Sequence, residues 1–386
     1  MARLAFLTIL IAAISSARAA LPAYKIRGVN LGSLFIVEPW MSNDTWVGMG
    51  CGNTKSEWDC VSSLGQEKAN AAFAKHWDTF ITKDDFQAMK QYNLNTVRIP
   101  VGHWLVEETI AQGENWPRGG MKYLDKVVGM AKDAGLNVIL DLHGAPGGQV
   151  ANNAFAGHTY DTAGFYSLAN YERTYTFLNN ITERVHTNPA YSTTFMLEVL
   201  NEPEPNHPDL VSTYYPQAYS HIRAVESDLK VAQASALTIQ FMDDTWGAGN
   251  PRENLPRRAS NLAFDNHRYL AFSSTTATKN DYLRTSCSDA FPSTTSNKPL
   301  IIGEWSLAVK QDNEWSDEFS PLKSENHAWY QQWWAAQVRA YEKEQGWVFW
   351  SWKTELVDDW RWSYKGAVEA GIIPKDFSKI EELAKC

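Results

Sequence analysis

Two segments of the sequence each place a glutamate directly after a short apolar run. The run Phe195–Leu200 leads to Glu202, and the run Leu300–Gly303 leads to Glu304. Pro203 cannot donate to a sheet ladder, so a strand formed by the first run must end before it. Two carboxyl groups at the carboxyl ends of parallel strands meet at one rim of a barrel. Such a pair supplies the two catalytic groups that cleavage of a glycosidic bond requires.

The two carboxyl groups need opposite protonation states for that reaction. One must hold a proton for the leaving oxygen, and the other must be ionised to attack the anomeric carbon. Arg98 is a permanent cation that could hold the ionised carboxylate, and Tyr269 could donate a further hydrogen bond. Asn201 could bond the sugar 2-hydroxyl. Carboxyl groups about 5–5.5 Å apart would retain the anomeric configuration and a wider gap would invert it, which the sequence leaves open.

The elements that must position these residues are short apolar runs separated by amphipathic, helix-like stretches. Strands are expected at Ile26–Leu31, Thr96–Pro100, Asn137–Leu142, Phe195–Leu200, Leu237–Phe241, Leu262–Asp265, Leu300–Gly303 and Trp347–Trp352. Helices are expected at Thr82–Tyr92, Tyr123–Ala134, Tyr171–Val185, Tyr214–Val225 and His327–Glu344. Eight strands alternating with helices predict a closed (β/α)8 TIM barrel. A doubly wound open sheet is the alternative, but no Gly-x-Gly-x-x-Gly follows the first strand.

Polar residues gather at the carboxyl end of every expected strand. They are Asn30, Glu38, Arg98, Asp141, His143, Asn201, Glu202, Asp243, Asp244, His267, Tyr269, Glu304 and Trp350. Several have a purely structural interpretation: Arg98 as an ion-pair residue, His143 and His267 as ordinary histidines, and Trp350 as core. Asp243-Asp244 is more typical of a solvated loop or a helix cap. Because random placement would scatter them, their common position favours a site.

Composition and charge narrow the possible partners and the compartment. The 386 residues carry a net charge of −9, which argues against a nucleic-acid partner. Residues 1–19 read as a secretory signal peptide, with Arg3, the apolar run Leu4–Ile14 and the small-x-small site ending at Ala19. No apolar run is long enough to span a bilayer. We therefore expect a secreted protein with no membrane partner, folded as one catalytic domain over residues 20–386.

The four cysteines fit the same compartment. In an oxidising environment Cys51, Cys60, Cys287 and Cys386 are expected to form two disulfides. Three connectivities are possible, and we prefer Cys51–Cys60 with Cys287–Cys386. A zinc site is not expected, because neither a histidine pair nor Cys-x-x-Cys accompanies them. Asn43 and Asn180 stand in glycosylation sequons.

The ordered motifs resemble glycoside hydrolase family 5, a family of retaining β-glycosidases on the (β/α)8 barrel. They are Arg27–Gly32, Glu38–Trp40, Val97–Pro100, Asp141–Gly147, Leu200–Pro203, His267–Tyr269, Gly303–Trp305 and Phe349–Lys353. The resemblance implies Glu202 as acid/base and Glu304 as nucleophile, with no metal or cofactor. It implies that the sugar at the cleavage point is bound by Glu38, Arg98, His143, Asn201, His267, Tyr269 and Trp350. It also implies a cis peptide between Trp350 and Ser351.

Within that family the segments Asn30–Trp40 and Gly346–Glu355 resemble both the fungal exo-β-1,3-glucanases and the fungal endo-β-1,6-glucanases. Gly32–Phe35 departs from the Gly-Gly-Trp-Leu of the exo enzymes, and Gly148–Phe155 and Met242–Trp246 depart as well. These departures favour an endo-β-1,6-glucanase. Phe272 matches an aromatic of the exo enzymes' sugar clamp, so an exo-β-1,3-glucanase is the alternative. The expected partner is a β-glucan polysaccharide, and the chain is expected to be a monomer.

Overall fold

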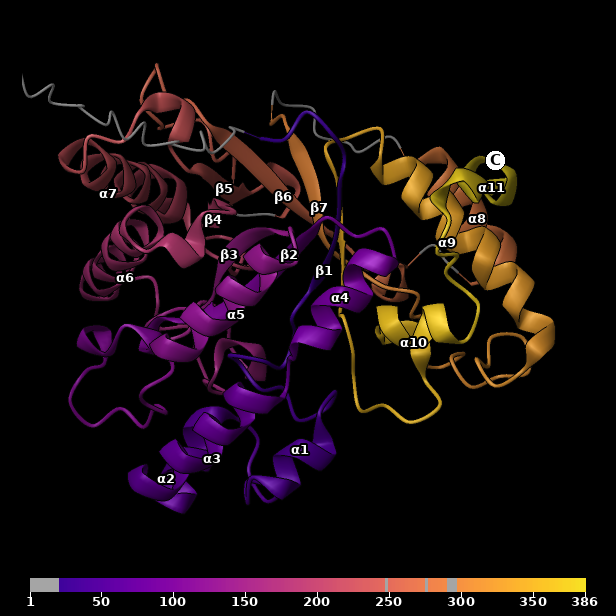
Figure 1. The fold of residues 1–386 in the computed structure, drawn as a ribbon, viewed down its shortest axis with the longest axis horizontal. Helices are drawn as coiled ribbons and strands as arrows, with labels where there is room; N and C mark the ends of the chain where they lie inside the picture. Colours follow the sequence, from indigo (N-terminus) through magenta and orange to yellow (C-terminus); the bar gives the residue numbers. More distant parts are fainter. Residues whose placement is uncertain (1–20, 247–248, 275–276, 290–296) are drawn as a thin grey trace, which may run out of the picture.

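The structure, a computed structural model, describes residues 21–246, 249–274, 277–289 and 297–386 (Figure 1). The predicted signal peptide, residues 1–19, lies outside them. Within the described residues the strands are β1 (Ile26–Asn30), β2 (Thr96–Gly102), β3 (Asn137–Gly144), β4 (Thr194–Glu198), β5 (Thr238–Met242), β6 (Leu262–Arg268), β7 (Leu300–Trp305) and β8 (Gly346–Phe349). All pair in parallel, each with the next, and β8 pairs with β1. The predicted single-domain (β/α)8 barrel is confirmed.

All eight strands end one to three residues from the expected positions, and three of these ends bear on the site. β4 ends at Glu198, three residues before Asn201, although the Asn201 backbone N–H still donates to the Leu142 carbonyl at 2.9 Å. β8 ends at Phe349, and the next peptide bond, between Trp350 and Ser351, is cis, as the resemblance implied. β7 runs two residues further than expected, so that Glu304 lies within the strand and not after it.

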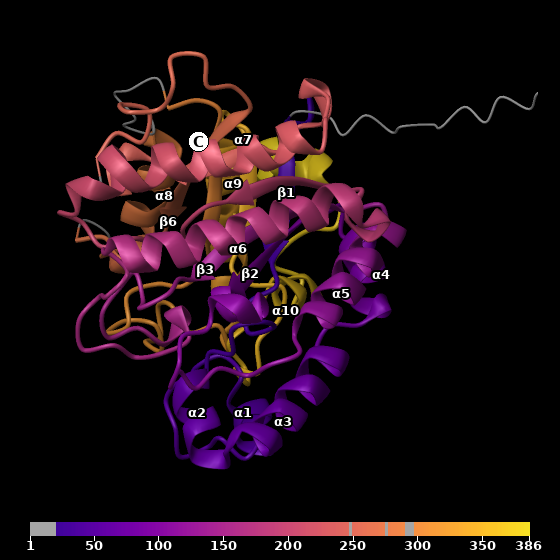
Figure 2. The same cartoon turned by 90° about the vertical axis from the view of Figure 1, so that its left-hand side faces the viewer.

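The helices form the outer layer of the barrel. Their bounds are α1 (Asn43–Gly48), α2 (Glu57–Leu64), α3 (Gln66–Thr79), α4 (Lys83–Gln91), α5 (Met121–Asp133), α6 (Leu168–Thr187), α7 (Tyr215–Asp228), α8 (Lys279–Ser288), α9 (His327–Tyr341), α10 (Tyr364–Glu369) and α11 (Ile380–Ala384). In both views α6 and α7 lie side by side, and α1, α2 and α3 gather at one end of the molecule (Figures 1 and 2). The five expected helices are present with ends shifted by a few residues.

Local sequence sets where these helices begin. Thr82 precedes α4: its side chain accepts a hydrogen bond from the Asp85 backbone N–H, and its own backbone N–H donates one to the Asp85 carboxylate. This reciprocal capping box satisfies two of the donors that a helix start leaves unpaired. Thr278 and Asp281 repeat the arrangement at the start of α8. Both helices therefore start where a short polar side chain precedes an acidic one by three residues.

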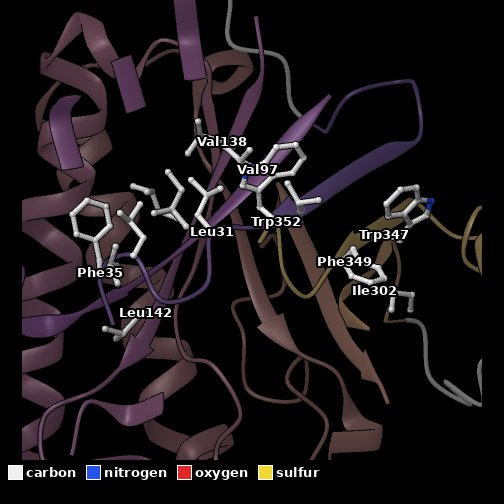
Figure 3. Packing of buried hydrophobic residues seen from close by; sticks show 14 of the residues in the cluster. Leu31, Phe35, Val97, Val138, Leu142, Ile302, Trp347, Phe349 and Trp352 are labelled. Carbon is white, nitrogen blue, oxygen red and sulfur yellow. The ribbon is translucent and has the colours of Figure 1, made fainter. Parts of the chain in front are cut away.

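Alternation along the strands divides the barrel into two environments. Outward residues pack against the helices: Figure 3 shows Leu31, Val97, Val138 and Trp352 in one group and Ile302, Trp347 and Phe349 in another. Inward residues begin as an apolar layer, namely Ile26, Ile139, Met196, Ala263, Ile301 and Val348. One step toward the carboxyl ends they become polar, namely Asn30, Arg98, Asp141, Glu198, Gln240 and Asp265, all fully buried. The apolar layer thus fills the amino-terminal end of the barrel, and a layer of polar side chains lies above it toward the carboxyl ends of the strands.

Both preferred disulfides are confirmed. Cys51 pairs with Cys60 within the segment that carries α1 and α2. Cys287, on α8, pairs with Cys386 across 99 residues and ties the end of the chain to the barrel wall. A bridge of that span removes more freedom from the unfolded chain than the nine-residue bridge does. Within the described residues no helix has the length and apolarity needed to cross a membrane.

Candidate active site

A pocket of about 470 Å³ opens at the carboxyl ends of the strands. Its lining comprises Glu38, Trp40, His143, Asn153, Phe155, Glu202, Trp246, Tyr269, Phe272, Glu304, Trp350 and Trp362. A second pocket, of about 530 Å³, lies away from it beside α1 and α3, and the one carboxylate in its lining is Glu355. Only the first combines paired carboxylates with several aromatic rings, which is the combination expected of a sugar site.

A β-bulge aims Glu304 into the pocket. Asn266 pairs with Ile302 and His267 pairs with Glu304, so Gly303 is an extra residue in β7. Because side chains alternate along a strand, the extra residue changes which face the following side chain occupies. Ile301 faces the barrel interior, and after the bulge Glu304 does so again, while Trp305 packs outward against Tyr341 of α9. Without the bulge, Gly303 would pair with His267, and the Glu304 side chain would point outward.

Arg98 lies beneath the pocket and contacts side chains from several strands. Its guanidinium donates to Glu304 Oε1 at 2.9 Å, to Asn30 Oδ1 at 3.0 Å and to Asn201 Oδ1 at 2.8 Å. It also pairs with the Glu198 carboxylate at 2.9 Å and with that of Asp141 at 3.0 Å. Tyr269 donates to the other oxygen of Glu304, Oε2, at 2.8 Å. Burial raises the pKa of Glu304, and the positive charges of His267 and Arg98 act against that rise.

Replacing Arg98 by lysine tests these contacts. Lysine keeps the charge but lacks the planar group through which the arginine reaches all five partners. We expect the free energy of unfolding to fall by about 3 kcal/mol, because buried carboxylates lose hydrogen bonds. Urea unfolding measures the change, with Arg257→Lys, at an exposed arginine, as the matched control. Coincident unfolding curves for Arg98→Lys and the parent would contradict the assignment.

Glu202 lies opposite Glu304 in a different setting. It has a positive φ of 38°, and its side chain is 18% exposed. The Nδ1 atom of His267 lies 2.6 Å from Glu202 Oε1 and 3.5 Å from Glu304 Oε2. One oxygen from each glutamate and one nitrogen of His267 all lie within 4.8 Å of one another. This spacing agrees with the shorter separation of about 5–5.5 Å that accompanies retention of configuration.

The other predicted site residues divide into two groups. Glu38, His143, Tyr269 and Trp350 line the pocket. The Trp350 and His143 rings stack with their centroids 5.5 Å apart. Arg98, Asn201 and His267 are not in the lining: Arg98 contacts Glu304 and Asn201, and His267 contacts Glu202.

Asn201 keeps one group available for a ligand. Its Oδ1 accepts from Arg98, while its buried Nδ2 has no hydrogen-bond partner among the residues that the structure describes. A buried donor left unpaired is unfavourable unless a ligand or water meets it. The arrangement suits a hydrogen bond to a sugar hydroxyl.

Glu38 is a third carboxyl group in the pocket. Trp40 donates to its Oε2 at 2.9 Å, and burial raises its pKa to about 7. Because the folded-state pKa lies above the unfolded value of 4.5, this group stabilises the fold below pH 4.5, and that contribution is lost as the pH rises through 7.

Glu38→Gln should remove this component, which amounts to about 3 kcal/mol. Unfolding measured from pH 4 to pH 9 should show a shallower loss of stability in the variant than in the parent. Glu57, whose pKa burial raises to about 8, contributes equally to both proteins and leaves the difference unaffected. Parallel curves would show that Glu38 is not a buried acid of this kind.

Several residues of the site were missed by the sequence analysis. Glu198 lies within the apolar run of β4, and its signal was a single acidic residue among buried ones. Asp265 precedes His267 by two positions, a spacing that puts both side chains on one face of a strand. Asp141 and His143 have the same spacing on β3. Trp246 and Trp362 line the pocket from 3-10 helices of three residues, which are too short to carry a periodic pattern.

Among the residues that the structure describes, two groups of side chains have the donor types for a metal ion. They are Glu198 with Asp265 and His267, and Glu202 with His267 and Glu304. The Arg98 guanidinium already pairs with Glu198 and Glu304 at 2.9 Å and lies 3.9 Å from Asp265. A permanent cation at the centre of these carboxylates supplies the charge that a metal would bring and repels a second cation. The donor set therefore does not suit a resident metal.

Comparison with known proteins places this geometry in context. The family model described as Cellulase (glycosyl hydrolase family 5) matches residues 61–356. A probable glucan endo-1,6-beta-glucosidase B of Neosartorya fischeri is 48% identical over 94% of this chain and 90% of that protein. A glucan endo-1,6-beta-glucosidase B of Emericella nidulans is 46% identical, covering 96% and 91%. A probable glucan 1,3-beta-glucosidase A of Aspergillus niger is 31% identical, covering 87% and 84%.

Solved structures share the fold at lower identity. The rutinosidase from Aspergillus niger superimposes with a TM-score of 0.72 at 20% identity, over 91% of this chain and 98% of that one. At this identity the likeness concerns the barrel alone.

Proposed function

The chain belongs to glycosyl hydrolase family 5, and we propose that it is a secreted, retaining endo-β-1,6-glucanase acting on fungal cell-wall glucan. Glu304 is the nucleophile and Glu202 the acid/base. The observation that carries this proposal is the unequal setting of two glutamates whose oxygens lie within 4.8 Å. Arg98 and Tyr269 hold both oxygens of Glu304, whereas Glu202 is partly exposed and bonded to His267 through one oxygen only.

In the first step Glu304 attacks the anomeric carbon while Glu202 protonates the leaving oxygen. Hydrogen bonds from Arg98 and Tyr269 favour the ionised form of Glu304 against the effect of burial. The bond between Glu202 Oε1 and His267 leaves Glu202 Oε2 to carry the proton toward the substrate. The product of this step is a glycosyl ester on Glu304 and a shortened glucan with a free hydroxyl.

In the second step Glu202, now a carboxylate, takes a proton from water, and the water oxygen attacks the same carbon. The ester bond to Glu304 breaks, and its carboxylate returns to Arg98 and Tyr269. Two displacements at one carbon restore the original anomeric configuration. Asn201 Nδ2 is suited to hold the sugar 2-hydroxyl through both steps.

The linkage preference rests on comparison. The relatives at 46–48% identity have names that specify endo-1,6 cleavage, and the relative named for 1,3 cleavage is 31% identical. The exo-β-1,3 alternative is favoured by one observation: Phe155 and Phe272 both line the pocket, and Phe272 is 78% exposed at its mouth. Secretion is supported by the leader-like residues 1–19 and by two disulfides.

Product analysis over time tests the proposal. A linear β-1,6-glucan should yield a spread of β-1,6 oligosaccharides, and laminarin, the β-1,3 glucan, should yield nothing. Glucose as the sole product from laminarin would replace the proposal by the exo-β-1,3 alternative. Glucose as the sole early product from the β-1,6-glucan would keep the linkage and overturn endo action.

A further inference from the structure

Asp265 lies beneath both catalytic candidates although no step of the proposed reaction uses it. It is fully buried on β6, two residues before His267. Its Oδ1 accepts the Gly303 backbone N–H at 2.7 Å, and its Oδ2 faces His267 Nε2 at 3.6 Å. One carboxylate therefore contacts the neighbour of the nucleophile and the partner of the acid/base.

The contact with Gly303 concerns the bulge that aims Glu304. A bulged residue leaves its backbone groups out of the regular ladder. Here the Gly303 N–H bonds to Asp265, and the Gly303 carbonyl accepts from Asn30 Nδ2 at 2.9 Å. A Cβ at position 303 would lie 2.1 Å from an Asp265 carboxylate oxygen, so only glycine permits this approach. Asp265 and Asn30 together fix the geometry of the bulge.

The contact with His267 concerns the proton on Glu202. Asp265 near Nε2 favours a proton there, and Glu202 Oε1 at 2.6 Å from Nδ1 favours a second. Burial lowers the pKa of His267, but Glu304 and Asp265 outweigh burial and hold it well above the usual value. His267 thus donates its Nδ1–H to Glu202 Oε1, so the acidic proton of Glu202 is carried by Glu202 Oε2.

Glu198 completes the arrangement as a neutral acid. One oxygen of Glu198, one of Asp265 and one nitrogen of His267 lie within 4.8 Å of one another. Glu198 Oε2 accepts from Arg98, whereas Glu198 Oε1 and Asp265 Oδ2 have no other hydrogen-bond partner among the described residues. A proton on Glu198 Oε1 would satisfy both atoms. Burial raises the pKa of Glu198 well above its usual range, while His267 and Arg98 outweigh burial at Asp265 and lower its pKa.

We propose that Asp265 is a positioning residue for both catalytic glutamates, holding the Gly303 bulge through Oδ1 and the His267 imidazolium through Oδ2, with Glu198 as its proton donor. This role rests on the proposed assignment of Glu202 and Glu304, and not on the linkage that the enzyme cleaves. The charged and titratable groups that surround Asp265 and His267 are Arg98, Asp141, Glu198, Glu202, Tyr269 and Glu304.

Asp265→Asn tests the proposal, because asparagine keeps the shape but can serve only one of the two contacts as an acceptor. We expect kcat to fall about 10- to 100-fold on whichever glucan the parent hydrolyses, with KM little changed. The pH–rate profile should move to higher pH on both limbs. Without the Asp265 charge, His267 loses its proton more readily, and both glutamates then lose the positive charge of a neighbouring group, which raises the pKa of each.

Two variants serve as comparisons. Asp243→Asn alters a buried carboxylate at the end of β5 that bonds Thr245 and Asn266, and it should keep the parental pH profile. Glu198→Gln retains a donor toward Asp265 and an acceptor for Arg98, so it should lower kcat far less than Asp265→Asn. An unmoved profile for Asp265→Asn, or one moved to lower pH, would overturn the proposal. A larger loss in Glu198→Gln would overturn the role of Glu198.

A spectroscopic measurement decides the case even if the parent hydrolyses neither glucan. In protein labelled with 15N-histidine, the His267 signal, assigned by its disappearance in His267→Gln, should show both ring nitrogens protonated at pH 7. In Asp265→Asn, one nitrogen should be unprotonated at the same pH. A neutral His267 in the parent would overturn the proposal, whereas failure of the glucan assay alone would count only against the proposed function.

Discussion

Glu304→Gln should lower kcat on β-1,6-glucan by at least about 10⁴-fold. The amide cannot attack the anomeric carbon, while its oxygen still accepts from Arg98 and its nitrogen can donate to the Tyr269 hydroxyl, whose oxygen lies 2.8 Å from Glu304 Oε2. The fold and the affinity for glucan should therefore be retained. Reducing-end release measures turnover, and calorimetric titration with a β-1,6 oligosaccharide measures binding.

Glu67→Gln, at an exposed glutamate on α3, is the matched control and should behave like the parent. A covalent test identifies the nucleophile directly. A 2-deoxy-2-fluoro-β-glucosyl fluoride slows the second displacement more than the first, because fluorine destabilises the oxocarbenium-like transition state and fluoride leaves without acid assistance. Mass spectrometry should find the sugar on the peptide containing Glu304. Parental turnover in Glu304→Gln, or label on another carboxylate, would remove Glu304 from its role.

The barrel and most of the candidate site could be predicted because both depend on local sequence. Apolar runs of strand length indicate strands that are buried on both faces. The polar residues that follow them indicate the rim of the barrel at the carboxyl ends of the strands. Glu202 and Glu304 were identified from this pattern, and the structure brings their oxygens within 4.8 Å. The family resemblance of the chain is confirmed by the family model and the relatives. The predicted fold is confirmed by the closed eight-strand barrel in the described residues.

The parts that escaped prediction depend on contacts between strands. The Gly303 bulge changes the inward face of β7, yet Leu300–Trp305 shows no sign of it, because a bulge is defined by the partner strand. The inward position of Glu198 is set by register with Asp141 on β3 and Gln240 on β5. Trp362 belongs to a short 3-10 helix after β8 and reaches the pocket by packing against Trp40. Tertiary placement decides all three.

Glu202→Ala should separate the two roles of the acid/base by substrate. On β-1,6-glucan, whose leaving group is a sugar alkoxide, loss of the acid should lower kcat about 10²- to 10⁴-fold. On a dinitrophenyl β-glucoside, whose leaving group needs no proton, the first displacement should proceed almost as in the parent. The ester on Glu304 should then accumulate, because no base remains to activate water. A burst of dinitrophenolate followed by a slow steady state is the expected time course.

Added azide should restore turnover of that aryl glucoside in Glu202→Ala. The small anion fits the space left by the carboxylate and attacks without a general base, so the product should be a glucosyl azide. Its configuration reports the mechanism: a β-azide requires two displacements through an ester on Glu304, whereas an α-azide would indicate a single displacement. Glu204→Ala, which removes a glutamate bonded to the Ala151 backbone N–H, should show neither burst nor rescue. Rescue there, or its absence in Glu202→Ala, would transfer the acid/base role away from Glu202.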